Sequence, residues 1–407
     1  MCRPRRLLSR GLFSCSTHPK GGQSMALNRF LSTALAVSVS AAGLSAPISA
    51  HAQYTERYLF STTTSSGGSE GHQASFLNDN GLVAGRYGML GKSVSGQAKI
   101  WDASGTGAPA LLWTEPPGYA PGGPIAGSVA VDINNTSVLF PHMVENVTSH
   151  QPVANLGANA FNDQGLVVGV RSEFIEGVGW TSNAKWAASP SGAAQAITVA
   201  GNQQVKPTQV NNVGQVIGTG TFANQTQAFV FDVNTSQSHL LFNSPLVTSS
   251  EVWDINDAGQ ILGKKTLSSG VSSAFLFNTA DGTFQDLPTS TNPLSPTQKG
   301  ALNNQGQIVF DNLFFDGQNW IDLRQSNGFT GTLTGLDINN NGQILLSHFY
   351  YTGAYSMGGT PLSNNYKNDY LILTTVPEPA SVLSMGLGLA GLAWILRRHR
   401  RQAALSA

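Results

Sequence analysis

Short apolar runs and polar turn residues alternate along most of the chain. Ile255 ends one apolar run, Asn256 to Gly259 form a polar stretch, and Ile261 and Leu262 begin the next run. Such runs of four to eight residues, bounded by Asn and Gly, are typical of β-strands joined by tight turns. The repeat region shows no helical period. The pattern therefore predicts an all-β fold.

The turn belongs to a repeated unit, Asn-x-x-Gly-x-aliphatic-x-Gly. Asn in the first position of a type I turn can bond its own downstream backbone, and Gly in the fourth can take the positive φ that closes the hairpin. A degraded copy begins at Asn134 and lacks the turn glycine. The predicted turn pairs of the clear copies are Asn78 with Gly81, Asn162 with Gly165, Asn211 with Gly214, Asn256 with Gly259, Asn303 with Gly306, and Asn339 with Gly342.

The spacing of the copies predicts the architecture. Successive starting asparagines lie 56, 28, 49, 45, 47 and 36 residues apart, and a four-stranded propeller blade needs about 40–50 residues. Further apolar runs, such as 227–232 and 273–277, give each unit about four strands. We expect a β-propeller of six or seven blades over residues 53–373, and a linear solenoid is the alternative. A strand over 54–62, with Tyr58 and Phe60 on one face, would complete the last blade.

The N-terminal residues predict export. From Met25 a basic residue, an apolar run over 30–44 and the small residues Ala50 and Ala52 follow in order. This is the pattern of a secretory signal peptide over 25–52, with cleavage expected after Ala52. Residues 1–24 precede this pattern and are either an over-called start or an extended basic region.

The C-terminal residues form a third region, over 376–401. A Val-Pro-Glu-Pro segment at 376–379 precedes an apolar stretch over 381–396, for which we expect a single hydrophobic helix. The stretch is shorter than the about 20 residues that usually span a bilayer. The basic cluster that follows it at 397–401 favours the cytoplasmic side, which places the repeats outside.

Composition and charge agree with an extracellular protein. Charged residues make up only 11% of the 407 residues, and both cysteines, Cys2 and Cys15, precede the predicted cleavage site. Residues 53–379 hold all 22 acidic residues and 22 − 10 = 12 basic ones, which gives a net charge of 12 − 22 = −10. An acidic body argues against nucleic acid as a partner, because phosphate binding needs a basic face.

The tail resembles the PEP-CTERM sorting signal of Gram-negative bacteria. The resemblance rests on Pro377, Glu378 and Pro379, the short apolar stretch, and the cluster that includes Arg397 and Arg398. It implies recognition by an exosortase, a transient stay in the inner membrane through the C-terminal helix, and a role near exported exopolysaccharide.

The repeats resemble the extracellular HAF-type repeat. The Asn/Gly half matches, whereas the second half keeps only Ala-Phe, at Ala228-Phe229 and Ala274-Phe275. The resemblance implies an architecture and no activity.

Candidate chemistry is sparse. Asp337, Asn339 and Asn341 match the first half of a calcium loop, but His348 stands where the bidentate Glu is required, so turn formation is the favoured interpretation. The histidines have no metal-ligand spacing and no nucleophile elbow is present. The G-x-G-x-x-G at 386–391 lies in the apolar tail, without a strand–turn–helix unit. We therefore assign no catalytic residue, metal or cofactor.

The sequence predicts an exported cell-surface or matrix protein with a non-catalytic interaction role, with exopolysaccharide or other surface proteins as partners. Two alternatives stay open. One is a secreted carbohydrate-active enzyme on the same scaffold, and the other is a single-pass anchored protein whose tail is never removed.

Overall fold

A computed structural model describes residues 53–65, 68–90, 97–105, 109–114, 130–140, 143–145, 150–153, 156–242, 244–288, 299–353 and 366–376. All of them belong to the second of two compact units, Ala50–Ala407. The predicted signal peptide with Ala50 and Ala52, and the sorting motif from Pro377 to Arg398, lie outside the described residues.

The described residues form five four-stranded antiparallel sheets and one eight-stranded sheet. We divide the eight-stranded sheet between β1 and β2 into two four-stranded halves and number the resulting seven sheets in chain order. Sheets 1 and 7 are joined edge to edge through β1 and β2. Sheet 1 holds β2 (Gly68–Leu77), β3 (Leu82–Leu90), β4 (Gln97–Asp102) and β5 (Ala110–Thr114). Sheet 2 holds β6 (Asp132–Ile133), β7 (Val138–Phe140), β8 (Met143–Glu145) and β9 (His150–Pro152). Sheet 3 holds β10 (Gly157–Phe161), β11 (Val167–Ile175), β12 (Gly179–Ala187) and β13 (Gln195–Ala196). Sheet 4 holds β14 (Val205–Val210), β15 (Gln215–Phe222), β16 (Gln225–Asp232) and β17 (Gln237–Leu240).

The remaining sheets complete the set, and each repeat hairpin joins the first two strands of its sheet. Sheet 5 holds β18 (Val247–Ile255), β19 (Gln260–Leu267), β20 (Ser272–Asn278) and β21 (Phe284–Asp286). Sheet 6 holds β22 (Ala301–Leu302), β23 (Ile308–Phe310), β24 (Leu313–Phe315) and β25 (Trp320–Asp322), followed by α1 (Leu323–Ser326). Sheet 7 holds β26 (Thr332–Ile338), β27 (Gln343–Tyr351), β28 (Tyr366–Val376) and β1 (Gln53–Ser65).

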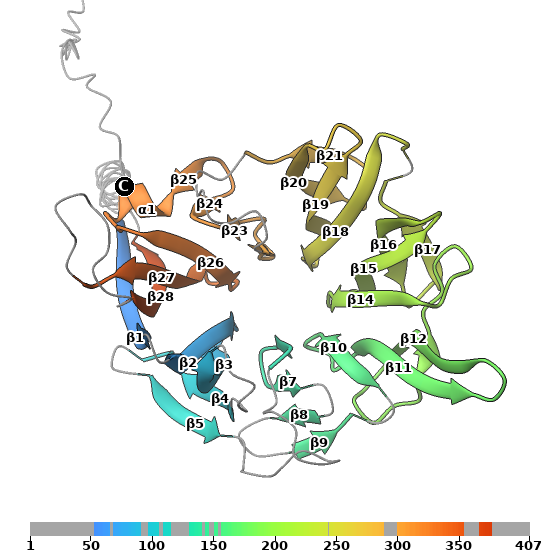
Figure 1. The fold of residues 1–407 in the computed structure, drawn as a ribbon, viewed down its shortest axis with the longest axis horizontal. Coiled ribbons are helices and arrows are strands. Elements are labelled where there is room, and N and C mark those ends of the chain that lie inside the picture. Colours follow the sequence, from blue (N-terminus) through green and yellow to red (C-terminus); the bar gives the residue numbers. More distant parts are fainter. Residues whose placement is uncertain are drawn as a thin grey trace, which may run out of the picture. The chain divides into compact units, whose positions relative to one another are not determined.

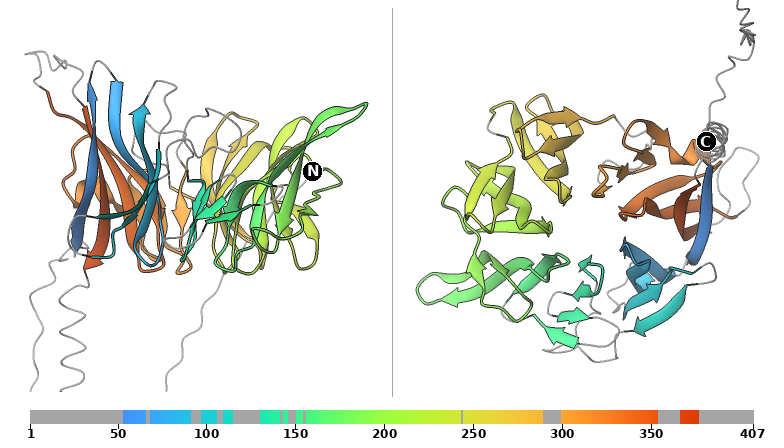
Figure 2. Two further views of the ribbon diagram at one scale, coloured as in Figure 1. Left: turned by 90° about the horizontal axis from the view of Figure 1, so that it is seen from below. Right: turned by 180° about the vertical axis from the view of Figure 1, so that it is seen from behind.

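The sheets follow one another around a common centre in a propeller-like arrangement (Figures 1 and 2). Seven clusters of buried apolar side chains are present among the described residues, and each draws on two neighbouring sheets. The middle strands are therefore buried on both faces, which explains the paired aliphatics after the turn. Ile261 and Leu262 are consecutive, and both are 0% exposed.

The N-terminal strand closes the circle, as predicted. β28 pairs with β1 along its whole length, from Val376 opposite Gln53 to Tyr366 opposite Thr64. The last strand of sheet 7 thus comes from the start of the described chain. Its sheet ends at Val376, three residues beyond the predicted limit at Leu373.

Two expectations about local structure were wrong. The ladder between β1 and β28 shifts register between Tyr58 and Phe60, and Leu59 is the extra residue. This bulge breaks the strict alternation of faces, so Tyr58 is 51% exposed, whereas Leu59 and Phe60 are buried. A one-turn helix, α1, also interrupts the repeat region, with its first N–H groups capped by Asp322.

The expected C-terminal hydrophobic helix over 381–396 lies beyond the described residues. Within the part that is described, no helix has the length and apolar character needed to span a membrane.

Candidate functional site

Each clear repeat forms the turn that the sequence predicts. In the hairpin of sheet 5, Gly259 donates its N–H to the Asn256 carbonyl at 3.0 Å, and φ at Gly259 is +75°. The Oδ1 atom of Asn256 accepts the N–H of Gln260 at 2.9 Å. Asparagine therefore has the local role that its spacing indicates.

The other five turn glycines have the same conformation and the same bond. Each donates its N–H to the carbonyl of its turn asparagine, at 3.0–3.2 Å. Their φ values all lie in the left-handed region that favours glycine: +77° at Gly81, +83° at Gly165, +86° at Gly214, +76° at Gly306 and +71° at Gly342. These glycines thus have a conformational role in the hairpins.

The turn asparagines also join the sheets into a closed ring. Each donates its Nδ2–H to the backbone carbonyl of the equivalent asparagine in the next sheet, at 2.9–3.0 Å. The last bond, from Asn339 to the Asn78 carbonyl, spans 261 residues of sequence and closes the circle. All seven side chains are buried. An aspartate could accept the turn bond but could not donate the bond between sheets. We call this set the asparagine ring: Asn78, Asn134, Asn162, Asn211, Asn256, Asn303 and Asn339.

The residues that follow the ring asparagines form a second closed ring. Each backbone N–H of this set donates to the side-chain Oδ1 of the equivalent residue in the next sheet, at 2.6–3.0 Å. We call it the outer ring: Asp79, Asn135, Asp163, Asn212, Asp257, Asn304 and Asn340.

Acids and amides alternate around the outer ring. Each carboxylate accepts Nδ2–H bonds from the amides on both sides, at 2.7–3.2 Å. No two carboxylates are neighbours, which avoids like-charge repulsion. Because seven is odd, the alternation fails once, where Asn304 meets Asn340.

A central cavity of about 590 Å³ is lined by residues of all seven sheets. Among its lining residues are three aspartates that each lie two positions before a ring asparagine: Asp132, Asp254 and Asp337. We call them the channel aspartates. Each uses one carboxylate oxygen to accept the following N–H of its own strand at 2.8–2.9 Å. The other oxygen accepts an N–H from the next sheet at 2.7–3.0 Å.

Only one residue of each predicted turn pair lines the cavity. The whole asparagine ring contributes to its lining. The turn glycines do not line it and have only the turn role predicted for them: Gly81, Gly165, Gly214, Gly259, Gly306 and Gly342. Because a glycine has no side chain to offer a ligand, these six positions serve the hairpin and leave the cavity surface to the asparagines.

Burial raises the pKa of all three channel aspartates. The pKa is about 7 for Asp132, about 8 for Asp254 and about 6 for Asp337. Desolvation is the largest cause, because an apolar surround disfavours the charged form. The N–H bonds lower the pKa in each case, while the charge of Asp337 raises it at the other two. The centre of the molecule therefore holds carboxylates that change charge between about pH 6 and pH 8.

The calcium candidates have other partners. Asp337 accepts the N–H groups of Leu77 and Ile338, Asn339 belongs to the asparagine ring, and Asn341 donates to the Asp79 carbonyl at 2.6 Å. In the described ranges, no three His, Cys, Asp or Glu side chains are grouped so that they could hold a metal ion. These contacts favour the turn interpretation, and calcium binding stays a prediction.

Sequence reasoning missed both rings and the channel aspartates. The signal for the outer ring was present, because every copy has Asp or Asn directly after the repeat asparagine. The choice between acid and amide at this position alternates between neighbouring sheets, which one copy alone does not reveal. The channel aspartates occur in only three copies, each as Asp-Ile-Asn, and the bonds that they accept from the next sheet depend on the tertiary fold.

The described residues thus belong to the class of all-β proteins with a propeller-like fold. The tail adds a finding of its own, because residues 375–401 match the model of the PEP-CTERM protein-sorting motif. That motif marks an exported protein that an exosortase processes for the cell surface. No curated protein sequence is significantly similar to this chain.

Several solved structures resemble the fold at low identity. TolB from Acinetobacter baumannii is 11% identical, covers 71% of this chain and has a TM-score of 0.41; this chain spans 63% of it. An oligogalacturonate lyase from Vibrio parahaemolyticus is 10% identical, with 80% of this chain and 99% of that one covered and a TM-score of 0.45. An oligogalacturonate lyase in complex with manganese is 12% identical, with the same coverage and a TM-score of 0.44. These similarities carry no information about activity or ligand.

Proposed function

We propose that this protein is a seven-bladed β-propeller of the HAF-repeat type, released at the cell surface by an exosortase, with a non-catalytic binding role toward exopolysaccharide. The PEP-CTERM motif carries the proposal. The motif comes directly after the propeller in the chain: the matched residues begin at 375, and the closing strand β28 ends at Val376. Removal of the tail after this point would leave the seven sheets complete.

The first test is the intact mass of the exported protein in each cell fraction. We expect a mature chain that starts at Gln53 and lacks Arg397 and Arg398. A variant with Glu378→Ala in the sorting motif should keep the tail and stay with the inner membrane. A wild-type protein that retains its tail arginines would instead support the single-pass anchored alternative.

The non-catalytic role is supported by the bonding of the channel aspartates. Both oxygens of each carboxylate accept backbone N–H groups, so these acids act as links between sheets. A glycosidase needs two carboxyl groups free to face one bond of the substrate. Screening the purified protein on polysaccharides tests this point, and release of oligosaccharides would support the carbohydrate-active enzyme instead.

A further inference from the structure

The hairpin of β11 and β12 extends beyond its own sheet. β10 pairs with β11 only up to Val170, and β13 pairs with β12 only at Lys185 and Trp186. Within the described chain, residues 171–183 therefore pair only with one another, as a two-stranded arm. Figure 2 shows this arm projecting past the neighbouring strands.

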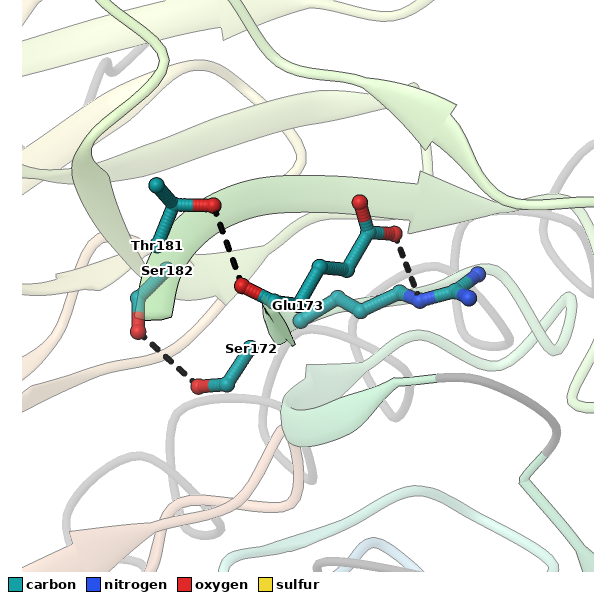
Figure 3. Close-up of polar contacts among 5 residues, drawn as sticks. Ser172, Glu173, Thr181 and Ser182 are labelled. Carbon is teal, nitrogen blue, oxygen red and sulfur yellow. Dashed lines mark hydrogen bonds and ion pairs between the residues drawn. The ribbon is translucent and has the colours of Figure 1, made fainter. Parts of the chain in front are cut away.

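A two-stranded hairpin has marginal stability by itself. Side-chain contacts between the two strands of the arm add to its backbone pairing. Ser172 and Ser182 share a hydrogen bond at 2.9 Å, and Thr181 donates to the Glu173 carbonyl at 3.3 Å (Figure 3). Arg171 pairs with Glu173 on the same strand at 2.7 Å. The arm thus presents its side chains in a defined arrangement.

The end of the arm exposes large apolar side chains. Trp180 is 75% exposed and Phe174 is 63% exposed, and their rings pack edge to face at 5.7 Å. Ile175 and Val178 beside them are also exposed. A contiguous exposed patch of this kind marks a binding surface. Because Phe174 supports Trp180 from one side, the indole has a preferred orientation.

Trp180 contributes to the lining of a groove of about 730 Å³ between sheets 3 and 4. Side chains with hydroxyl and amide groups share this lining, including Thr219, Thr226 and Gln204. Within the described residues, these three side chains make no hydrogen bond to another side chain. Among the described residues, the lining includes one cation, Lys206, and no carboxylate.

We propose that this groove binds a chain of neutral sugars, with Trp180 stacking on one ring. The proposal rests on the binding role proposed above and assigns it a site. Hydroxyl and amide groups can both donate to and accept from sugar hydroxyls, and an aromatic face suits the apolar face of a pyranose ring. A protein partner would instead contact the apolar end of the arm, and self-association of the variants distinguishes that case. The net charge of −10 over residues 53–379 disfavours an acidic polymer.

The test compares variants of the purified exported protein in affinity electrophoresis and calorimetry. The probes are exopolysaccharide from the producing cell, neutral dextran and acidic polygalacturonate. We expect Trp180→Ala to weaken binding to a neutral probe at least about tenfold, as for a central aromatic anchor. Trp180→Tyr should keep most of the affinity. Phe284→Ala is the control, because Phe284 is 53% exposed on sheet 5. Thermal unfolding of each variant shows that the fold is kept.

Four results would overturn the assignment. Wild-type affinity in Trp180→Ala would refute the groove as the glycan site and leave the proposed binding role intact. No binding of the wild-type protein to any probe would refute both the site and the binding role. Self-association that Trp180→Ala abolishes, with no effect on glycan, would make the arm a contact between copies. Loss of binding in Lys206→Gln, together with preference for polygalacturonate, would contradict the neutral ligand.

Discussion

Replacing Asn256 by aspartate tests the asparagine ring with almost no change in shape. The Asn256 Nδ2 donates to the Asn303 carbonyl at 3.0 Å and to the Gln260 Oε1 at 2.8 Å, and the residue is 3% exposed. An aspartate keeps the turn bond to the Gln260 N–H but cannot donate. The Gln260 amide can turn and donate to the new carboxylate, so the contact that is lost is the one to Asn303.

The cost follows from burial. An unsatisfied buried carbonyl costs about 1–3 kcal/mol, and the desolvation of the new charge adds to it, toward about 3–5 kcal/mol in total. We expect Asn256→Asp to lose this much free energy of unfolding at pH 8. In acid the new carboxyl can take up a proton and donate again, so the loss relative to wild type should shrink to about 1 kcal/mol. Asn256→Ala should show no such recovery.

The assay is equilibrium unfolding in guanidinium chloride at pH 8 and pH 5, with the midpoint and slope fitted separately. Asn224→Asp is the control, since Asn224 is an exposed turn residue. If the ring variant differs from this control by less than about 0.5 kcal/mol at pH 8, the ring bond does not hold the sheets together. Equal losses at both pH values would refute the role of the missing donor.

Two further predictions concern the channel aspartates and Gly263, the last glycine of the repeat unit in sheet 5. The pKa of each channel aspartate is raised in the folded state, to between about 6 and 8, so the folded protein binds more protons than the unfolded chain below those values. The free energy of unfolding should therefore increase as the pH falls from 9 through 8 toward 5, by at most about 1.4 kcal/mol per pH unit for each group. Asp254→Asn should flatten the plot of this free energy against pH at its upper end. A protein more stable at pH 9 than at pH 6 would contradict the raised pKa values. Gly263→Ala places a Cβ in a steric clash with the Glu251 carbonyl oxygen, so we expect a loss of about 1–3 kcal/mol. Gly105→Ala, where no atom of the described residues lies within 4 Å of the new Cβ, should be neutral in the same unfolding assay.

The repeat could be predicted from the sequence because its causes are local. Asn256 and Gly259 define a turn through bonds within five residues, and the aliphatics that follow define a buried strand. The spacing of the copies then led to a propeller of six or seven blades, and the N-terminal strand was correctly expected to complete the last one. The bulge at Leu59 was not predictable, because it depends on the register against β28.

The contacts that depend on closure could not be predicted in this way. The degraded copy at Asn134 lacks its glycine, yet its Nδ2 still donates to Asn162 and completes the ring. Whether an acid or an amide follows the ring asparagine is decided by the neighbouring sheets, 28 to 261 residues away in sequence.

The sequence by itself determined the hairpin, its repetition and the sorting tail, because each depends on residues close together in the chain. Only the tertiary structure decided that the repeated asparagine holds the next sheet as well as its own turn. A side-chain amide has an acceptor and two N–H donors, and the local turn uses the acceptor and, at Asn256, one donor. The partner of the other donor, the carbonyl of the next ring asparagine, is in place only once the neighbouring sheet has packed beside it.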